Sequence, residues 1–271
     1  MIPPFRSLFF LPFFLLAAPL LRAQATSPVI REGSKSLPLA GESFRFDDHE
    51  AFVILPEKKR GPIPWVWYAP TLRGLPSQAE IWMFQRFLAA GIAIAGIDVG
   101  ESYGSPEGRK TYSRFHHHLT HTRKFSPKPC LLARSRGGLM LYNWAVENPE
   151  KVAGLAGIYP VCNLESYPGL AKAAGAYQLT AAELKKQLER HNPVSRLAPL
   201  AKAGVPVFHL HGDQDKVVPL EANTALLAEH YQKLGGPITI EIIKGGGHDM
   251  RKDWFQSESL TNFAINRALA R

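Results

Sequence analysis

The sequence has only two cysteines among its 271 residues, which excludes a disulfide-rich scaffold. We expect Cys130 near the start of one strand and Cys162 beyond the end of the next. Parallel strands rise by about 3.3 Å per residue, which would separate the two sulfurs by more than about 10 Å. A disulfide bond needs a much closer approach. We therefore expect two small, buried side chains rather than a bridge.

Acidic residues are scarce relative to basic ones. The chain has 23 Asp and Glu against 32 Lys and Arg, which gives a formal charge of +9. No basic stripe alternates with aromatic residues, and no nucleic-acid motif, internal repeat or low-complexity tract occurs. We therefore expect no nucleic-acid partner. A basic surface suits contact with acidic polymers.

A long apolar run occurs only at the N-terminus. Arg6 precedes an apolar stretch at residues 7–21, which ends in Ala23-Gln24-Ala25. This order is typical of a secretory signal peptide over residues 1–25, and its loss with Arg6 and Arg22 would leave a charge of +7. The run is short and broken by prolines, so an uncleaved membrane anchor is the lesser alternative. We expect an exported protein, periplasmic or secreted, without stable membrane insertion after cleavage and without a lipid anchor.

The remaining chain alternates between strand and helix patterns. Residues 26–41 predict a loosely held lead, followed by one domain at 42–271 with a cap insertion at about 159–203. Strands are expected at 43–46, 51–55, 65–68, 92–98, 130–133, 152–158, 205–210 and 238–243, and helices at 78–90, 110–124, 139–146, 181–190 and 253–270. Such alternation favours a mostly parallel sheet with helices on both faces.

A short segment in the middle of the chain carries the strongest chemical signal. Ser135 lies between a buried strand and a helix, with the small residues Ala133 and Gly137 two positions before and after it. Small residues are required where strand and helix backbones nearly touch at so tight a turn. The pattern is typical of a nucleophilic serine with alanine in the first place, and an ordinary strand–helix corner is the alternative.

Two later strands end in the residues that such a serine needs. Asp215 follows the strand at 205–210, and His248 lies in the glycine-rich turn after the strand at 238–243. A serine hydroxyl requires a neutral imidazole to take its proton, and the imidazole requires a carboxylate that orients it. Ser135, Asp215 and His248 therefore form a candidate catalytic triad. Glu165 is the alternative acid.

Three segments resemble motifs of the α/β-hydrolases. They are A-R-S-R-G at 133–137, H-G-x-x-D-x-x-V-P at 211–219 and residues 98–105, which resemble D-x-x-G-x-G-x-S with Glu101 and Tyr103 in unusual places. The motifs are most similar to those of the prolyl-oligopeptidase, acetyl-xylan-esterase and dienelactone-hydrolase branches. The resemblance implies an α/β-hydrolase fold and a serine hydrolase that forms an acyl-enzyme without cofactor or metal.

Two backbone N–H groups are predicted to hold the developing oxyanion. One belongs to Arg136, directly after the nucleophile. The other should come from the loop after the strand at 65–68, where Pro70 has no N–H to donate. We expect Thr71 in this role, with Leu72 as the alternative.

Arginines flank the candidate nucleophile, and guanidinium groups bind carboxylates through two parallel hydrogen bonds. The Ser135-Arg136 pair resembles that of glucuronoyl esterases, in which the arginine helps to hold the oxyanion. This favours an ester on a carbohydrate, bearing a carboxylate or uronate, with Arg134, Glu101 and Tyr103 as substrate contacts. Alternatively, both arginines pair with acids such as Glu101 or Glu165 and do not touch the substrate.

Ester hydrolysis on a small-molecule or carbohydrate substrate is the leading function. The expected single domain lacks the large propeller with which prolyl oligopeptidases filter peptides. An exported serine peptidase of that type, a non-catalytic carbohydrate-binding protein and acyl transfer to a sugar are the alternatives, and the oligomeric state stays open.

Histidines cluster at 116–118 and 121 in the helix before the strand of Cys130. A metal site at His117 and His121 is conceivable, but no acidic or cysteine ligand accompanies them, so a solvent-facing cluster is favoured. His209 and His211 share one face of a strand and are predicted to be structural.

Overall fold

The computed structural model describes Met1 and residues 28–58 and 61–270. The predicted signal peptide at 1–25 and the first two residues of the lead that follows it lie outside the described residues, apart from Met1. Among the residues described, no helix combines the length and the apolar character that a membrane crossing requires.

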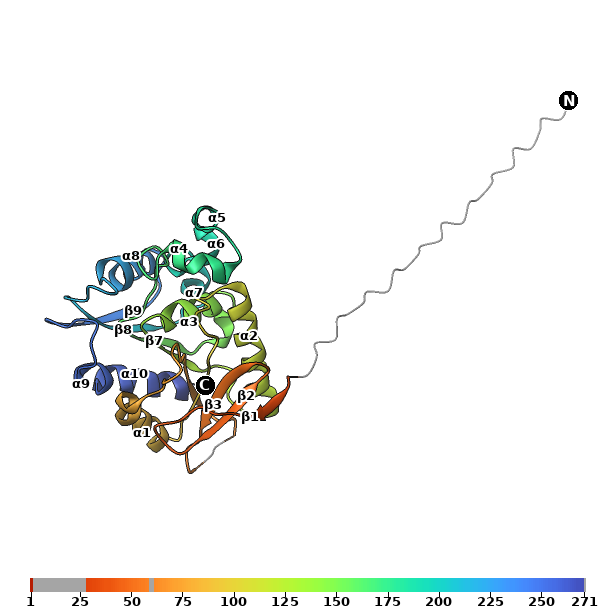
Figure 1. Ribbon diagram of the computed structural model, residues 1–271, viewed down its shortest axis with the longest axis vertical. Helices are drawn as coiled ribbons and strands as arrows, with labels where there is room; N and C mark the ends of the chain where they lie inside the picture. The colour runs from red at the N-terminus through yellow and green to blue at the C-terminus, as the bar shows by residue number, and fades with distance from the viewer. Residues whose placement is uncertain (2–27, 59–60, 271) are drawn as a thin grey trace.

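One sheet runs through the described part of the chain, with helices on both of its faces (Figure 1). The first strand pairs are antiparallel as far as the contact between β3 and β5, and all later pairs are parallel. In spatial order the strands are β1 (Ile30–Glu32), β2 (Glu42–Phe46), β3 (His49–Ile54), β5 (Ala93–Ile97), β4 (Trp65–Tyr68), β6 (Cys130–Arg134), β7 (Gly154–Ile158), β8 (Val207–Gly212) and β9 (Ile238–Ile243). The predicted sheet with helices on both faces is confirmed.

The central strands are buried on both sides. Every residue of β4, β5, β7 and β8 is buried, which explains their continuous apolar sequences. The edge strand β9 contains partly buried and exposed residues and none that is buried. Cys130 and Cys162 are both free and fully buried, as expected from the sequence.

Two apolar layers attach the helices to the sheet. One layer lies under α2 (Pro106–His117), α3 (Gly137–Ala145), α7 (Ala198–Lys202) and α8 (Leu226–Lys233), and the other under α1 (Ile81–Ala89), α9 (Lys252–Phe255) and α10 (Glu258–Leu269). Phe84, Phe87 and Leu260 in the second layer have no exposed surface. Burial of each such side chain contributes about 1.5–3 kcal/mol.

The predicted insertion after β7 consists of short helices. They are α4 (Leu170–Ala173), α5 (Ala181–Lys186) and α6 (Leu188–His191), which Figure 1 shows grouped beyond α3 and which α7 follows. The predicted capping box of Thr180 and Glu183 opens α5. The expected helix at 181–190 is two helices, because the chain leaves helical geometry at Gln187.

Three further elements differ from the sequence-based expectation. The lead is not loose where it is described, because β1 pairs with β2 and Lys35 donates to the carbonyl oxygens of Arg73 and Leu75 at 3.0 and 2.7 Å. Helix α2 begins at Pro106, four residues before the predicted start, because proline suits the first helical position. The C-terminal helix is divided in two, because Ser257 caps a new helix with a hydrogen bond from the Leu260 N–H.

Candidate active site

Ser135 occupies a strained turn between β6 and α3. Its φ of 48° lies in the left-handed region that residues other than glycine rarely adopt. Its N–H donates to Ile158 O at 3.0 Å, and its carbonyl oxygen accepts from the N–H groups of Gly138 and Val161 at 3.0 and 2.8 Å. These bonds hold the turn from both sides, so the surrounding fold maintains the strain and presents the hydroxyl outward.

The small residues around the turn are required by close backbone contacts. A Cβ on Gly137 would lie 3.3 Å from Ala69, whereas a Cβ on Gly138 would lie only 2.3 Å from the carbonyl oxygen of Val161. Ala133 is buried, as its predicted role demands. Sequence reasoning singled out Gly137, but the tighter restriction falls on its neighbour Gly138, for which the Gly-Gly pair was the available signal.

Ser135, His248 and Asp215 come together in the order predicted. Ser135 Oγ lies 2.9 Å from His248 Nε2, and His248 Nδ1 lies 2.7 Å from Asp215 Oδ2. The Asp215 side chain is fully buried, and that of His248 is 18% exposed. Glu165, the alternative acid, is exposed in the insertion and makes no contact with His248 among the described residues. The geometry therefore favours Asp215.

The loop after β8 keeps Asp215 ionised. Its Oδ1 accepts from the N–H groups of Val217 and Val218 at 2.9 and 2.8 Å. Burial alone would raise the pKa of Asp215, but the hydrogen bonds from His248 and from these two N–H groups outweigh it and lower the pKa below its usual range. A carboxylate held in this state can stabilise an imidazolium beside it.

A buried chain of hydrogen bonds supports the same loop from behind. His211 Nε2 must donate to the carbonyl oxygen of Val218 at 2.8 Å, which leaves its Nδ1 to accept from the Thr224 hydroxyl at 2.8 Å. Thr224 Oγ1 then accepts from His209 Nδ1 at 3.0 Å, and the Tyr142 hydroxyl donates to His209 Nε2 at 2.8 Å. Each neutral histidine thus has one possible tautomer.

Burial keeps both histidines of this chain neutral. Burial, followed by the neighbouring His211, lowers the pKa of His209 to about 3, and burial also lowers the pKa of His211. The prediction that both are structural is confirmed, since neither has any exposed surface. His211 Nε2 also lies 3.7 Å from Asp215 Oδ2, so the chain ends beside the candidate acid.

The His248 loop is fixed by aromatic residues that sequence reasoning did not assign to it. The ring of Tyr159 lies 4.3 Å from the His248 ring, and its hydroxyl donates to Asp249 O at 3.2 Å. Burial raises the pKa of Tyr159 to about 12, so the hydroxyl stays a donor. Trp254 Nε1 donates to Asp249 Oδ1 at 2.7 Å. The contacts of Tyr159 join segments about 90 residues apart in the chain, and no local motif predicts them.

The His248 loop crosses the end of β8 with no space for a side chain. A Cβ on Gly212 would lie 2.1 Å from the carbonyl oxygen of Gly246. The N–H of Gln214 donates to the same oxygen at 2.9 Å. The two loops that carry Asp215 and His248 are therefore in direct backbone contact.

The predicted oxyanion donors lie beside the nucleophile. Thr71, Leu72 and Arg136 line a cavity of about 230 Å³ together with Ser135 and His248. Within residues 28–58 and 61–270, the backbone N–H groups of Thr71 and Arg136 make no hydrogen bond and stay available. The N-terminus of α3 also points at this cavity, which favours negative charge there. The choice between Thr71 and Leu72 stays a prediction.

Residues 128–265, about half of the chain, match the prolyl oligopeptidase family. The chain belongs to the prolyl oligopeptidase family. No curated protein sequence matches it.

Three solved structures illustrate the likeness in fold. A dipeptidyl aminopeptidase IV candidate of Bacteroides ovatus has a TM-score of 0.66 at 12% identity, covering 89% of this chain and 36% of that one. A puromycin-hydrolyzing peptidase of Mycobacterium tuberculosis has a TM-score of 0.61 at 16% identity, and the match covers 82% of this chain and 38% of that one. A truncated carbohydrate esterase from gut microbiota has a TM-score of 0.64 at 16% identity, and the match covers 81% of this chain and 91% of that one.

This prolyl oligopeptidase family member thus spans little more than a third of the length of the two peptidases. Its likeness to these structures confirms the predicted α/β-hydrolase fold. Family and fold together make it a member of the prolyl oligopeptidase family with an α/β-hydrolase fold.

The two arginines around the nucleophile of this family member are both paired with acids. Arg134 Nη1 lies 2.7 Å from Glu80 Oε1, a carboxylate that is 1% exposed and also accepts from the Tyr68 hydroxyl at 2.9 Å. Arg136 forms an ion pair with Glu101. Both arginines are therefore paired with acids, which is the arrangement that the alternative reading of the sequence expected. Glu80 was missed, although its capping box with Ser77 was visible in the sequence.

Only one of the three predicted substrate contacts lines the cavity. Arg134 lines the cavity, while its Nη2 lies 2.8 Å from Met250 Sδ and its guanidinium covers the Phe255 ring at 4.9 Å. Glu101 and Tyr103 are not among the residues that line this cavity, and their role as substrate contacts stays a prediction. Glu101 is exposed and paired with Arg136, and Tyr103 is 3% exposed.

The histidines of α2 form no metal centre in the described part of the chain, where no three potential ligands come together. His117 and His121 are exposed, as expected from a solvent-facing cluster. His116 differs, because it is buried and its Nε2 donates to Pro127 O at 2.9 Å.

Proposed function

We propose that the protein hydrolyses carboxylic esters through an acyl-enzyme on Ser135. The continuous hydrogen-bond chain from Ser135 Oγ through His248 to Asp215 carries this proposal. His248 Nε2 takes the hydroxyl proton while Oγ attacks the carbonyl carbon, and Asp215 stabilises the imidazolium. The carbonyl oxygen becomes negative and accepts from the N–H groups of Arg136 and Thr71.

The second half of the reaction reverses these roles. His248 gives its proton to the leaving alcohol oxygen as the tetrahedral intermediate collapses to the acyl-enzyme. Water then loses a proton to His248 and attacks the acyl carbon, and the returned proton restores Ser135 when the acid leaves. No group beyond the side chains and backbone donors is required for these steps.

One observation favours esters over peptides. The acids beside the nucleophile are engaged, Glu80 by Arg134, Glu101 by Arg136 and Asp249 by Trp254, so none of these three carboxylates is spare for the amino group of a peptide. A serine peptidase is the second candidate, supported by the family itself.

The proposed substrate is a carbohydrate ester that bears a carboxylate or uronate. Arg134 lines the cavity, and the thioether of Met250 beside its Nη2 is a weak acceptor that a carboxylate would replace favourably. The cavity of about 230 Å³ suits the ester group and its nearest atoms, with the rest of the substrate outside. Export to the periplasm or beyond, where such polymers occur, is part of the proposal.

The first experiment compares the protein with its Ser135→Ala variant. Short-chain nitrophenyl esters, acetylated sugars, methyl esters of uronates and aminoacyl nitroanilides form the substrate panel. We expect ester hydrolysis that is lost in the variant and little release from the nitroanilides. Faster turnover of the nitroanilides than of every ester would favour the peptidase.

Arg134→Lys tests the charge preference. Lysine can keep a charge contact with Glu80 but loses the planar fork that binds a carboxylate. We expect kcat/KM to fall for the uronate methyl ester and to change little for a neutral methyl ester. An equal loss on both substrates would exclude Arg134 as the group that selects charge.

A further inference from the structure

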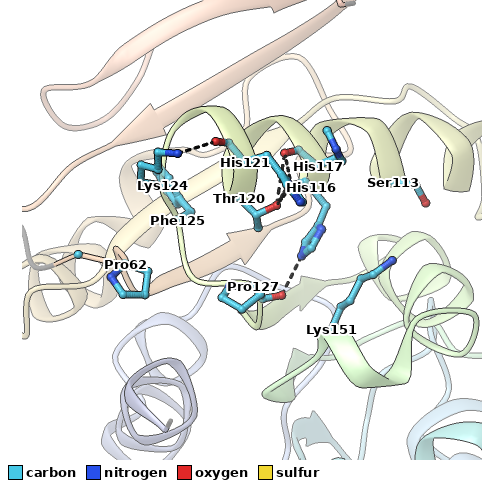
Figure 2. A pocket seen from close by; sticks show the side chains of 11 residues that line it. Pro62, Ser113, His116, His117, Thr120, His121, Lys124, Phe125, Pro127 and Lys151 are labelled. Carbon is cyan, nitrogen blue, oxygen red and sulfur yellow. Dashed lines mark hydrogen bonds between the residues drawn. The ribbon is translucent and has the colours of Figure 1, made fainter. Parts of the chain in front are cut away.

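A second cavity lies at the end of the sheet where the parallel strands begin, opposite the end that carries Ser135. It measures about 770 Å³, and part of its lining comes from Pro62 before β4, Pro127 before β6 and Lys151 before β7. These are the N-terminal ends of parallel strands, whereas Ser135, Asp215 and His248 all follow C-terminal ends. We call this cavity the α2 groove, because α2 and the turn after it form the other wall (Figure 2). A ligand there would leave the Ser135 cavity free.

Only cationic or neutral groups line the α2 groove among the described residues. Lys124 is exposed, donates to His121 O at 3.2 Å and has no carboxylate within ion-pair distance in the described part of the chain. Lys151 bonds Asn148 Oδ1 at 2.8 Å and lies 3.7 Å from the largely exposed Glu150. Arg123, beside the groove, is by contrast paired with Glu42. The groove therefore offers one positive charge, at Lys124, with no acid beside it in the described part of the chain, and a second, at Lys151, that is shared with an exposed carboxylate.

The remaining lining of the groove is suited to a chain with both polar and apolar faces. Pro62, Phe125 and Pro127 supply apolar surface. His117 and His121 stack with ring centroids 4.0 Å apart and planes 12° apart. His121 Nδ1 lies 3.1 Å from His117 O, so the stack has a fixed orientation.

The cations lie at different ends of the groove. Figure 2 shows Lys124 and Lys151 on opposite sides, with Thr120 and Pro127 between them. A ligand that satisfies both needs two negative groups separated by a body with apolar faces. Uronate sugars have this form, because each ring carries a carboxylate and a C–H face. A flat membrane cannot follow a concave wall. Single-stranded nucleic acid, whose bases can also stack on histidine rings, is the competing ligand that the titrations below test.

We propose that the α2 groove binds an acidic oligosaccharide, with uronate carboxylates at Lys124 and Lys151 and sugar faces against Pro62, Pro127 and the stacked histidines. This inference rests on the proposed carbohydrate esterase function. The groove would hold one part of an acidic polymer while another part, or another chain, reaches Ser135 at the far end of the sheet.

Calorimetric titration of the Ser135→Ala protein with trigalacturonate tests the groove without ester chemistry. We expect binding that weakens as salt rises from 50 to 300 mM, because the contact is electrostatic. Adding Lys124→Ala and Lys151→Ala to the Ser135→Ala protein should lower its affinity for trigalacturonate at least tenfold. The exposed pair Lys185→Ala and Lys186→Ala in α5 removes the same charge elsewhere and should leave the affinity unchanged.

Neutral xylotriose and a short single-stranded oligonucleotide complete the titrations. Equal affinity for xylotriose would overturn the role of charge, and equal or tighter binding of the oligonucleotide would overturn the assignment to carbohydrate. Failure of trigalacturonate to bind, or an equal loss in both lysine pairs, would overturn the groove itself.

Assays on a small soluble ester separate this inference from the proposed function. The Lys124→Ala, Lys151→Ala protein with Ser135 intact should cleave such an ester at the wild-type rate. An active enzyme that does not bind trigalacturonate would overturn the groove and leave the esterase proposal standing. Groove-dependent binding by a protein inactive on every ester would overturn the esterase and sustain the groove.

Discussion

The two ends of the parallel strands differ in how their positively charged side chains are paired. Beside Ser135, Arg134 is fixed to the buried carboxylate of Glu80, and Arg136 is paired with Glu101. At the other end, Lys124 is exposed to solvent with no acid beside it in residues 28–58 and 61–270. Pairing with Glu80 fixes the Arg134 guanidinium in one orientation and leaves its Nη2 for a ligand, whereas the open Lys124 ammonium can turn toward a ligand from solvent. Four experiments would break or sharpen this contrast.

Asp215→Asn should have the largest effect. The asparagine keeps the shape and the acceptor for Val217 and Val218, but its amide can donate to His248 Nδ1 and favour the wrong tautomer. We expect kcat for esters to fall by about 10⁴-fold. Trigalacturonate binding should not change, because the α2 groove is at the far end. A loss below tenfold would return Glu165 to consideration as the acid.

Glu80→Gln should be the most destabilising charge change. It leaves the Arg134 guanidinium, whose side chain is 14% exposed, without its anion, which costs about 3 kcal/mol in the free energy of unfolding. Glu258→Gln is the matched control, because Arg86 and Glu258 lie at a similar 2.6 Å but are well exposed. The control should cost less than about 1 kcal/mol in urea unfolding. Equal losses would contradict a special role for the buried pair.

Protonation of the buried histidine chain gives a smaller effect that depends on pH. The folded pKa of His209 is about 3, while an unfolded histidine takes up its proton below pH of about 6.5. Between these two pH values the unfolded chain therefore binds a proton on this histidine, whereas the native protein keeps it neutral. Stability should fall as pH drops from about 6.5 toward 3, with His209 contributing about 1.4 kcal/mol per pH unit.

Urea unfolding between pH 7 and 4.5 checks this slope. The window lies above the range in which Asp215 would contribute, since its pKa is lowered. His209→Gln should flatten the dependence. An unchanged slope in the variant would mean that His209 accepts a proton in the folded state.

The groove lysines should have the smallest effect on stability. Lys124→Ala and Lys151→Ala remove side chains whose ammonium groups make few contacts, so unfolding free energies should stay within about 0.5 kcal/mol of wild type. Chemical denaturation measures this directly. A loss near that of Glu80→Gln would show that these lysines stabilise the fold, and the contrast between the two ends would disappear.

The parts of the fold that could be predicted are those with local signals. The strands at 65–68 and 238–243 were predicted with their observed bounds, because continuous apolar or β-branched runs mark them. The order of Ser135, Asp215 and His248 along the chain also carried information, since each follows a strand of the same sheet. The sequence therefore allowed a prediction of residues that lie at a tight turn or directly after a strand.

The parts that could not be predicted depend on contacts between distant segments. Arg134 and Glu80 are 54 residues apart, and nothing local shows which acid the arginine will meet. Tyr103 lies in a loop segment, and nothing local in the sequence shows that it is only 3% exposed. The α2 groove is assembled from the approaches to three strands, and no motif marks it.

The backbone contact between Gly212 and Gly246 sets a boundary for redesign of the substrate preference. Any side chain at Gly212 would drive the His248 loop away from the strand that carries Asp215. A library that seeks new acyl or sugar preferences should therefore keep both glycines constant and vary Leu72 and Met250. These two residues line the Ser135 cavity and are half exposed, so they can change size while the triad stays aligned.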